Sequence, residues 1–115
     1  MPTRSSLLRI HDMLESIRGI ERAIAGKTFR DYERSWILRS ALERGIEVIS
    51  EASRHIGREF KMRHKEVRWK DIAGIGNILR HEYQRIDGLI IWNAVKDDLP
   101  VLKKALLAIK ASLSE

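Results

Sequence analysis

Apolar residues recur along this chain every three or four positions, which is the spacing of amphipathic helices. The first stripe lies between positions 5 and 24 and consists of Leu7, Ile10, Met13, Leu14, Ile17, Ile20 and Ile24. The sequence AGKT that follows supplies a glycine at which a helix can stop. It also supplies Thr28 as the N-cap of a short helical turn, with Asp31 completing a capping box. The pattern predicts a long first helix and a short second one.

The segment from about 34 to 56 has an apolar arc that covers nearly half of a helix. One quadrant of the arc contains Ile37, Ala41, Gly45, Val48, Ala52 and Ile56, and the next contains Leu38, Leu42, Ile46 and Ile49. This arc is wider than one neighbouring helix needs to cover. The helix is therefore expected to face both a core and a second subunit, or to be the central helix of a monomeric bundle in which Ala and Gly permit close packing.

Helical spacing continues to the end of the chain. After a charged connection from 57 to 69, a helix is expected to begin at Lys70 or Asp71 and to carry the stretch GNILRHEY at its end. Asp87 is a candidate N-cap for the next helix, and Pro100 fits the first turn of a final one. The predicted fold is all-α, a single domain over 1–115 that forms an up-and-down bundle of four main helices with one or two additional short helices.

Composition restricts the class of protein. The 115 residues include 22 Lys and Arg against 16 Asp and Glu, a formal net charge of +6, which favours an anionic partner such as RNA, DNA or an acidic protein. The basic residues are scattered among acidic ones, so charge alone does not choose among these partners. The absence of cysteine from the sequence favours a reducing compartment. Because no apolar run is long enough for a signal peptide or a membrane span, we expect a soluble cytoplasmic protein.

The histidines and carboxylates give few signs of metal or cofactor chemistry. The four histidines lack the spacing of a metal site, and the GxG in AGIGN lies in a helical context rather than in a phosphate-binding loop. Neither a metal nor a cofactor is expected. Glu43, Glu47 and Glu51 share one helix face with arginines, which is typical of a salt-bridged surface.

The stretch GNILRHEY offers a different chemistry. An imidazole such as that of His81 can take and give a proton near neutral pH, as cleavage of RNA through its own 2′-hydroxyl requires. The guanidinium of Arg80 would hold the phosphate, and the phenol of Tyr83 would donate a further hydrogen bond. The alternative is that these residues are simply helix-end or surface groups.

A family resemblance adds to this interpretation. The segments LERGIEVISEAS, WKDIAGIGNILRHEYQRID and IIWNAVKDDLPVLKKAL resemble the HepT-like family of the HEPN superfamily, small all-helical toxins encoded beside a minimal nucleotidyltransferase antitoxin. The resemblance covers almost the whole chain. It implies a homodimer whose paired motifs line a cleft, metal-independent ribonuclease activity on RNA, and a tyrosine that the nucleotidyltransferase modifies with AMP.

The family motif is an Arg and a polar residue, usually Asn, then three residues, His, any residue and Tyr. Asn77, His81 and Tyr83 stand at matching positions, which implies an orienting group, a general acid and base, and the acceptor of AMP. Gly76 stands where the family has its catalytic Arg. Arg80 lies one turn later and only about 40° around the helix axis, so it is the candidate phosphate holder. The alternative is a catalytically degenerate HEPN protein, a nucleotide-binding or interaction partner of a nucleotidyltransferase without ribonuclease activity.

Overall fold

The computed structural model describes the backbone of residues 2–82 and 88–113 and the side chains of residues 4–80 and 88–113. Its elements are α1 (Pro2–Ile24), α2 (Phe29–Arg34), α3 (Trp36–Ser53), α4 (Arg58–Arg63), α5 (Trp69–Glu82), α6 (Gly88–Asn93), the π-helical segment η2 (Ala94–Asp98) and α7 (Leu99–Leu113). These ranges contain no β-strand, and the all-α prediction is confirmed.

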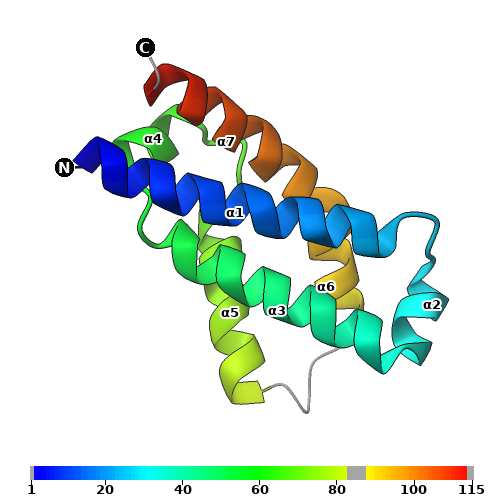
Figure 1. The fold of residues 1–115 in the computed structure, drawn as a ribbon. Coiled ribbons are helices and arrows are strands. Elements are labelled where there is room, and N and C mark those ends of the chain that lie inside the picture. The colour runs from blue at the N-terminus through cyan, green and yellow to red at the C-terminus, as the bar shows by residue number, and fades with distance from the viewer. Residues whose placement is uncertain (1, 83–87, 114–115) are drawn as a thin grey trace.

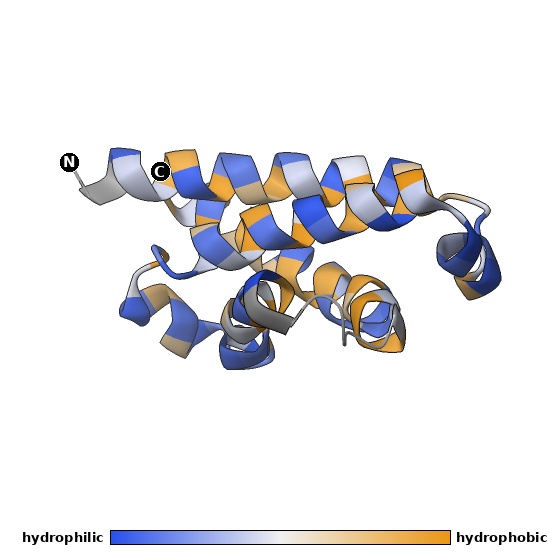
Figure 2. Ribbon diagram, turned by 90° about the horizontal axis from the view of Figure 1, so that it is seen from below, coloured by the Kyte–Doolittle hydropathy of each residue, from blue (hydrophilic) through white to orange (hydrophobic). Residues whose placement is uncertain are grey.

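The long helices form a compact stack. α1 lies against α3 on one side and α7 on the other, and α3 packs in turn against α5 (Figure 1). Both ends of the chain lie at the same end of the molecule (Figure 1). Hydrophobic and hydrophilic positions alternate around the helices in Figure 2, as expected for amphipathic helices that surround one core. No helix of the described part has the length and apolarity that crossing a membrane requires.

The predicted start and stop signals act as expected between α1 and α3. Gly26 adopts a positive φ of 73°, a conformation that glycine reaches without steric cost. Thr28 and Asp31 form the predicted capping box at the start of α2. Ser35 then caps α3, because its side chain accepts a hydrogen bond from the backbone N–H of Leu38 at 3.0 Å.

The segment from 57 to 69 differs from the charged connection that we expected. It contains the short helix α4, whose Phe60 is buried in the core. A single apolar residue shows no periodicity, so the sequence pattern could not indicate this turn. α5 begins at Trp69, one or two residues before the predicted start at Lys70 or Asp71. Asp87, the predicted N-cap of α6, lies outside the described residues.

The last helices are continuous rather than separate. α6 passes through η2 directly into α7, and the backbone N–H of Leu99 bonds to the carbonyl of Ala94, five residues earlier. Pro100 lies in the first turn of α7, as predicted. Proline has no N–H, and its ring crowds the carbonyl four residues before it. The wider π-helical turn ahead of Pro100 reduces this steric clash.

Most of the wide apolar arc of α3 belongs to the core of this chain. Leu42 and Ile46, which lie within this arc, are only 0% and 3% exposed. Gly45 lets α1 approach closely, because a Cβ at this position would lie 2.7 Å from Cδ1 of Ile20. The part of the arc that remains exposed is its beginning, where Ile37 is 75% exposed. The apolar arc is therefore explained by α3 being the central helix of a bundle within one chain, except at the beginning of α3.

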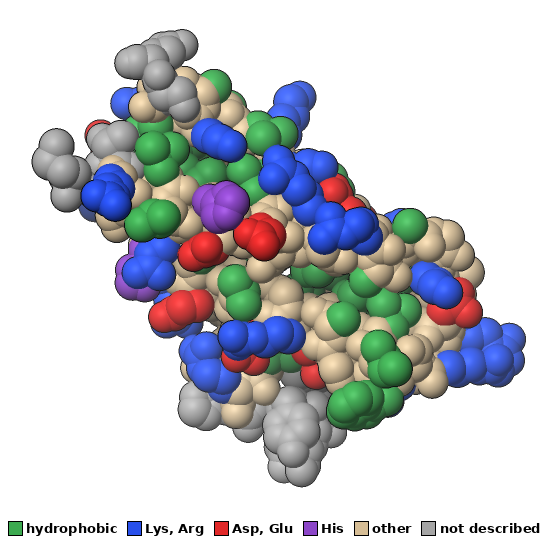
Figure 3. Space-filling view, in the orientation of Figure 1, with side chains coloured by type: hydrophobic (Ala, Val, Ile, Leu, Met, Phe, Trp, Pro, Cys, Tyr) green, Lys and Arg blue, Asp and Glu red, His purple; other side chains and the backbone are tan. Residues whose placement is uncertain are grey.

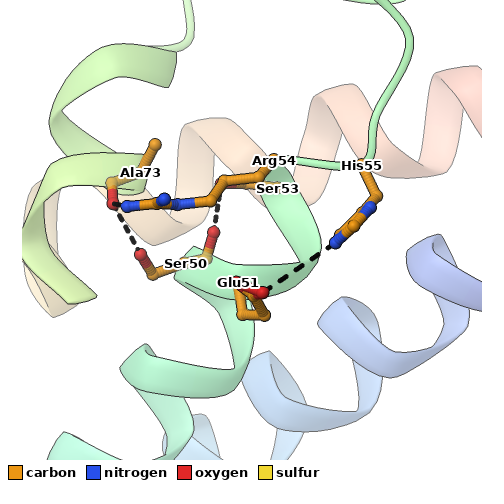
Figure 4. A network of polar contacts seen from close by, with 6 residues as sticks. All are labelled: Ser50, Glu51, Ser53, Arg54, His55 and Ala73. Atoms are coloured by element: carbon orange, nitrogen blue, oxygen red, sulfur yellow. Dashed lines mark hydrogen bonds and ion pairs between the residues drawn. The ribbon is translucent and has the colours of Figure 1, made fainter. Parts of the chain in front are cut away.

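A buried hydroxyl joins α3 to α5. Ser50 Oγ donates to the carbonyl of Ala73 at 2.9 Å and accepts from the backbone N–H of Gly76 at 3.1 Å. Arg54 donates to the same carbonyl through Nη2 at 3.1 Å (Figure 4). A Cβ on Gly76 would lie 2.4 Å from Ser50 Oγ and 2.8 Å from Ser50 Cβ. Gly76 is therefore a close-packing position, and any side chain there requires Ser50 to move.

Two glycines of α5 provide a matched test of this contact. Gly74→Ala introduces a Cβ that meets nothing within 4 Å, so we expect an increase in the free energy of unfolding of up to about 1 kcal/mol. Gly76→Ala forces the same atom against Ser50, and overpacking of this kind typically costs about 1–3 kcal/mol. Urea unfolding followed by circular dichroism would measure both changes.

The same experiment in a Ser50→Gly background identifies the atom responsible. Without the Ser50 side chain, the cost of Gly76→Ala should disappear, whereas the effect of Gly74→Ala should stay as it was. Equal effects of the two alanine substitutions in the unaltered background would contradict the proposed packing role of Gly76.

Candidate active site on helix α5

The exposed side of α5 holds two of the predicted site residues. Asn77 and Arg80 are exposed, whereas Gly76 is buried against α3. At about 100° per residue, positions 77, 80 and 81 occupy adjoining parts of the helix surface. His81 lies in the last turn of α5, but its side chain is outside the described part, and Tyr83 lies outside the described residues altogether. The structure thus brings Asn77 and Arg80 to one face.

Arg80 folds back over the turn that contains Gly76. Its Nη1 atom lies 3.6 Å from the position that a Cβ on Gly76 would occupy. The reason is general, since side chains of an α-helix point toward its N-terminus and cover the preceding turn. A guanidinium that starts from position 80 therefore reaches the turn where the motif has its Arg. Within the described part of the chain, Arg80 forms no ion pair.

Three helices form a shallow depression beside Arg80. It is lined by Arg9 and Asp12 of α1, Arg44, Glu47, Val48, Glu51 and Ala52 of α3, and Arg80 itself. Positive and negative side chains are mixed here, and Figure 3 shows the same mixture over one whole face of the molecule. The depression is therefore not a uniformly basic groove.

The acidic residues of α3 have partners of their own. Glu47 Oε1 lies 3.3 Å from Nη1 of Arg44, and Glu51 Oε1 lies 3.9 Å from Nε2 of His55. Burial raises the pKa of Glu43, the first acid of this series, and Arg39 opposes that shift. These contacts agree with the prediction of a salt-bridged surface, and they leave the guanidinium of Arg80 without a carboxylate partner among the described residues.

Two residues of this region escaped the sequence-based prediction. Ser50 interrupts the apolar face of α3 and is only 1% exposed, so a polar residue in an apolar stripe was the available signal. Arg54 lies at the C-cap of α3 and reaches across to Ala73 of α5 (Figure 4). Its place beside the site depends on how α3 and α5 are aligned, which no local sequence pattern specifies.

Metal ligands do not gather in the described part of the chain. No group of three or more His, Cys, Asp or Glu side chains there could hold a metal ion. The chemistry available on α5 is that of an amide, a guanidinium and, in the following position, an imidazole. This set suits a phosphate group and proton transfer.

Known proteins with similar sequences share one description. The family model "Ribonuclease HepT-like" matches residues 13–109. A "Putative RNase" of Methanocaldococcus jannaschii is 35% identical over 95 residues, which cover 83% of this chain and 87% of that protein. A "Probable ribonuclease HepT" of Thermococcus cleftensis is 34% identical over 94 residues, 82% of this chain and 86% of that protein.

A third relative extends the comparison. A "Putative RNase" of Caldanaerobacter subterraneus subsp. tengcongensis is 38% identical over 85 residues, 74% of this chain and 75% of that protein. No solved structure gave a significant match. The family match spans most of the chain, and the all-helical fold agrees with the resemblance noted in the sequence. On these grounds the chain belongs to the HepT-like ribonuclease family.

Proposed function

We propose that this chain is a metal-independent endoribonuclease and the toxin of a pair whose antitoxin is a minimal nucleotidyltransferase. The observation that supports it most is the position of Arg80, an exposed residue whose Nη1 atom lies 3.6 Å from the place of a Cβ on Gly76. Asn77 lies on the same side of the helix, and His81 follows Arg80 directly. The names of the relatives, which include the words RNase and ribonuclease, agree with this activity.

The proposed reaction uses the substrate's own nucleophile. His81 removes the proton of the RNA 2′-hydroxyl, and the 2′-oxygen attacks the adjacent phosphorus. The bond from phosphorus to the 5′-oxygen breaks, and that oxygen receives a proton from the imidazolium, leaving a 2′,3′-cyclic phosphate and a 5′-hydroxyl. Arg80 stabilises the charge that develops on the phosphate oxygens, and the Asn77 amide orients the same group.

A second candidate function has specific support in the packing of α5. The contact between Gly76 and Ser50 leaves no room for an Arg at the usual motif position. A degenerate family member would keep the fold and bind a nucleotide or its nucleotidyltransferase partner without cleaving RNA. The two candidates differ in whether Arg80 supplies enough of the missing charge.

We further propose that the protein forms a homodimer through the beginning of α3. Trp36 and Ile37 are 72% and 75% exposed, and hydrophobic side chains gather over this end of α3 in Figure 3. Adjacent large apolar side chains that face water commonly mark an interaction surface. A second copy that covers them would remove this area from water.

The proposed acceptor of AMP is Tyr83. The chain has two tyrosines, and the other, Tyr32, is only 1% exposed. The ring of Tyr32 packs against Trp92 with centroids 5.8 Å apart, and burial raises its pKa to about 12. A phenol held in this way is a poor nucleophile and a poor substrate for a second protein. Modification of Tyr83 would add negative charge next to a phosphate-binding site and so weaken RNA binding.

The ribonuclease proposal predicts cleavage in the presence of EDTA with cyclic phosphate ends. His81→Ala and Arg80→Ala should each lower the rate about a hundredfold or more, because each removes a group that acts in the transition state. Arg30→Ala is the matched control, since Arg30 is exposed on α2 and should not affect cleavage. Gel analysis of labelled RNA gives the rates, and circular dichroism shows whether each variant is folded.

Restoring the motif Arg separates the two candidate functions. Gly76→Arg alone is expected to disturb the contact with Ser50, so it is combined with Ser50→Gly. Activity in this double variant but not in the unaltered protein would identify a decayed ribonuclease and end the role proposed for Arg80. If neither protein cleaves any RNA, the enzyme assignment is wrong.

The dimer proposal predicts a mass of two chains by light scattering at micromolar concentration. Ile37→Asp should dissociate the dimer and leave the unfolding midpoint of the monomer nearly unchanged, because the side chain is exposed in one chain. Leu42→Asp should instead unfold the protein, because it buries a charge in the core. A monomer in the unaltered protein, or a dimer that survives Ile37→Asp, would argue against this interface.

The modification proposal predicts a gain of one AMP mass after incubation with the partner nucleotidyltransferase and ATP. Tyr83→Phe should abolish the gain, whereas Tyr32→Phe, in the buried aromatic cluster, should leave it. Intact-protein mass spectrometry measures this directly. Modification that persists in Tyr83→Phe would place the acceptor elsewhere.

A further inference from the structure

Arg54 extends from the end of α3 to the same turn of α5 that Arg80 covers. Its Nη2 atom donates to the carbonyl of Ala73 at 3.1 Å, and that carbonyl also accepts from Ser50 Oγ at 2.9 Å (Figure 4). Ser50 Oγ in turn lies 2.4 Å from the place of a Cβ at Gly76, with Nη1 of Arg80 3.6 Å from that place. Both guanidinium groups therefore lie close to one short stretch of α5, from Ala73 to Gly76.

The charge of Arg54 is available for a ligand. The residue is exposed, and within the described part of the chain it forms no ion pair. Other arginines nearby do form them, such as Arg44 of α3 with Glu47 and Arg68, directly before α5, with Asp71. The nearest acid in sequence, Glu51, lies 3.9 Å from His55.

A held guanidinium suits a phosphate better than a mobile one. The guanidinium has five N–H donors, and the carbonyl of Ala73 is the partner of one nitrogen, Nη2, so donors remain for phosphate oxygens. The hydrogen bond to Ala73 also restricts the side chain before any ligand arrives, which reduces the entropy lost on binding. Asn77 follows Ala73 by one helical turn and is exposed on this side of α5.

We propose, on the basis of the ribonuclease function above, that Arg54 binds a phosphate next to the scissile one, which Arg80 holds. The substrate class is then single-stranded RNA, whose backbone presents successive phosphates to a strip of positive side chains. A duplex would present a broad, rigid surface, whereas these two side chains lie along a short length of one helix. In this proposal the RNA strand runs along α5 past Asn77, and the two guanidinium groups contact successive phosphates.

The first test measures binding of a short 2′-O-methyl oligouridine, which cannot be cleaved, at several salt concentrations by fluorescence anisotropy. Each lost phosphate contact on a single strand should reduce the slope of log K against log salt by about 0.7. Arg54→Gln is expected to show this reduction and about tenfold weaker binding, and Arg54→Lys should restore the slope because it keeps the charge. Arg30→Gln, on exposed α2, should match the unaltered protein.

The second test uses substrate length. The dinucleotide UpA has only the scissile phosphate, so Arg54→Gln should leave its cleavage unchanged while slowing cleavage of a longer oligouridine. Arg80→Gln should slow both. Thermal unfolding of each variant shows whether the loss of the Ala73 hydrogen bond, rather than of the charge, explains the change.

The possible failures have different signatures. If His81→Ala and Arg80→Gln lower activity but Arg54→Gln alters neither the salt slope nor the cleavage of long RNA, the role of Arg54 is wrong and the ribonuclease function stands. Equal slowing of UpA and long RNA by Arg54→Gln would also overturn it. An unaltered protein that neither binds nor cleaves RNA would overturn both proposals.

Discussion

The hydrogen bonds of Ser50 to the backbone of α5 determine which side of that helix faces water. Ser50 Oγ bonds to the carbonyl of Ala73 and to the N–H of Gly76, and both bonds require α5 to approach α3 very closely. Only a residue without Cβ at position 76 permits that approach. With Gly76 against α3, Asn77 and Arg80 remain exposed, and Arg80, one turn after Gly76, lies on nearly the same side of α5. The same buried contact that joins the two helices therefore also presents the candidate site.

This arrangement brings a cation close to position 76, although the residue at that position is glycine. A helix brings residues four positions apart to the same side, and its side chains point back toward the N-terminus. Arg80 thus covers the turn that an Arg at position 76 would start from, and Arg54 reaches it from α3. Gly76 provides the close packing against α3, whereas Arg80 and Arg54 provide the positive charge near that turn.

Local patterns predicted much of the fold, because helix caps and apolar stripes depend on residues close in sequence. The capping box of Thr28 and Asp31 and the place of Pro100 in α7 are examples. α4 was missed because Phe60 alone anchors it in the core. The same patterns could not distinguish a core face from a subunit interface. Leu42, for example, lies within the wide apolar arc but is fully buried in this chain.

Only the residues of the candidate site that lie on the single helix α5 could be predicted to lie together. Asn77 and Arg80 share a face because of their spacing, and the structure places them there. Ser50 and Arg54 come from α3, and their contacts with α5 depend on the mutual alignment of two helices that are distant in sequence. The arrangement of His81 and Tyr83 relative to them stays a prediction, because the described side chains end at residue 80 before resuming at 88.

The two proposed phosphate-binding arginines bear directly on how modification by AMP would act. AMP joined to a tyrosine carries a phosphodiester with one negative charge, the same group that an RNA backbone presents. Tyr83 follows Arg80 by three residues in the sequence, and in the proposed function its phosphate would compete for the guanidinium of Arg80. An arginine that has no carboxylate partner among the described residues would bind that phosphate readily, whereas a paired one such as Arg44 would first have to leave Glu47. The modification would then inhibit by occupying the phosphate site itself, and the availability of Arg54 and Arg80 that favours RNA binding would equally favour this inhibition.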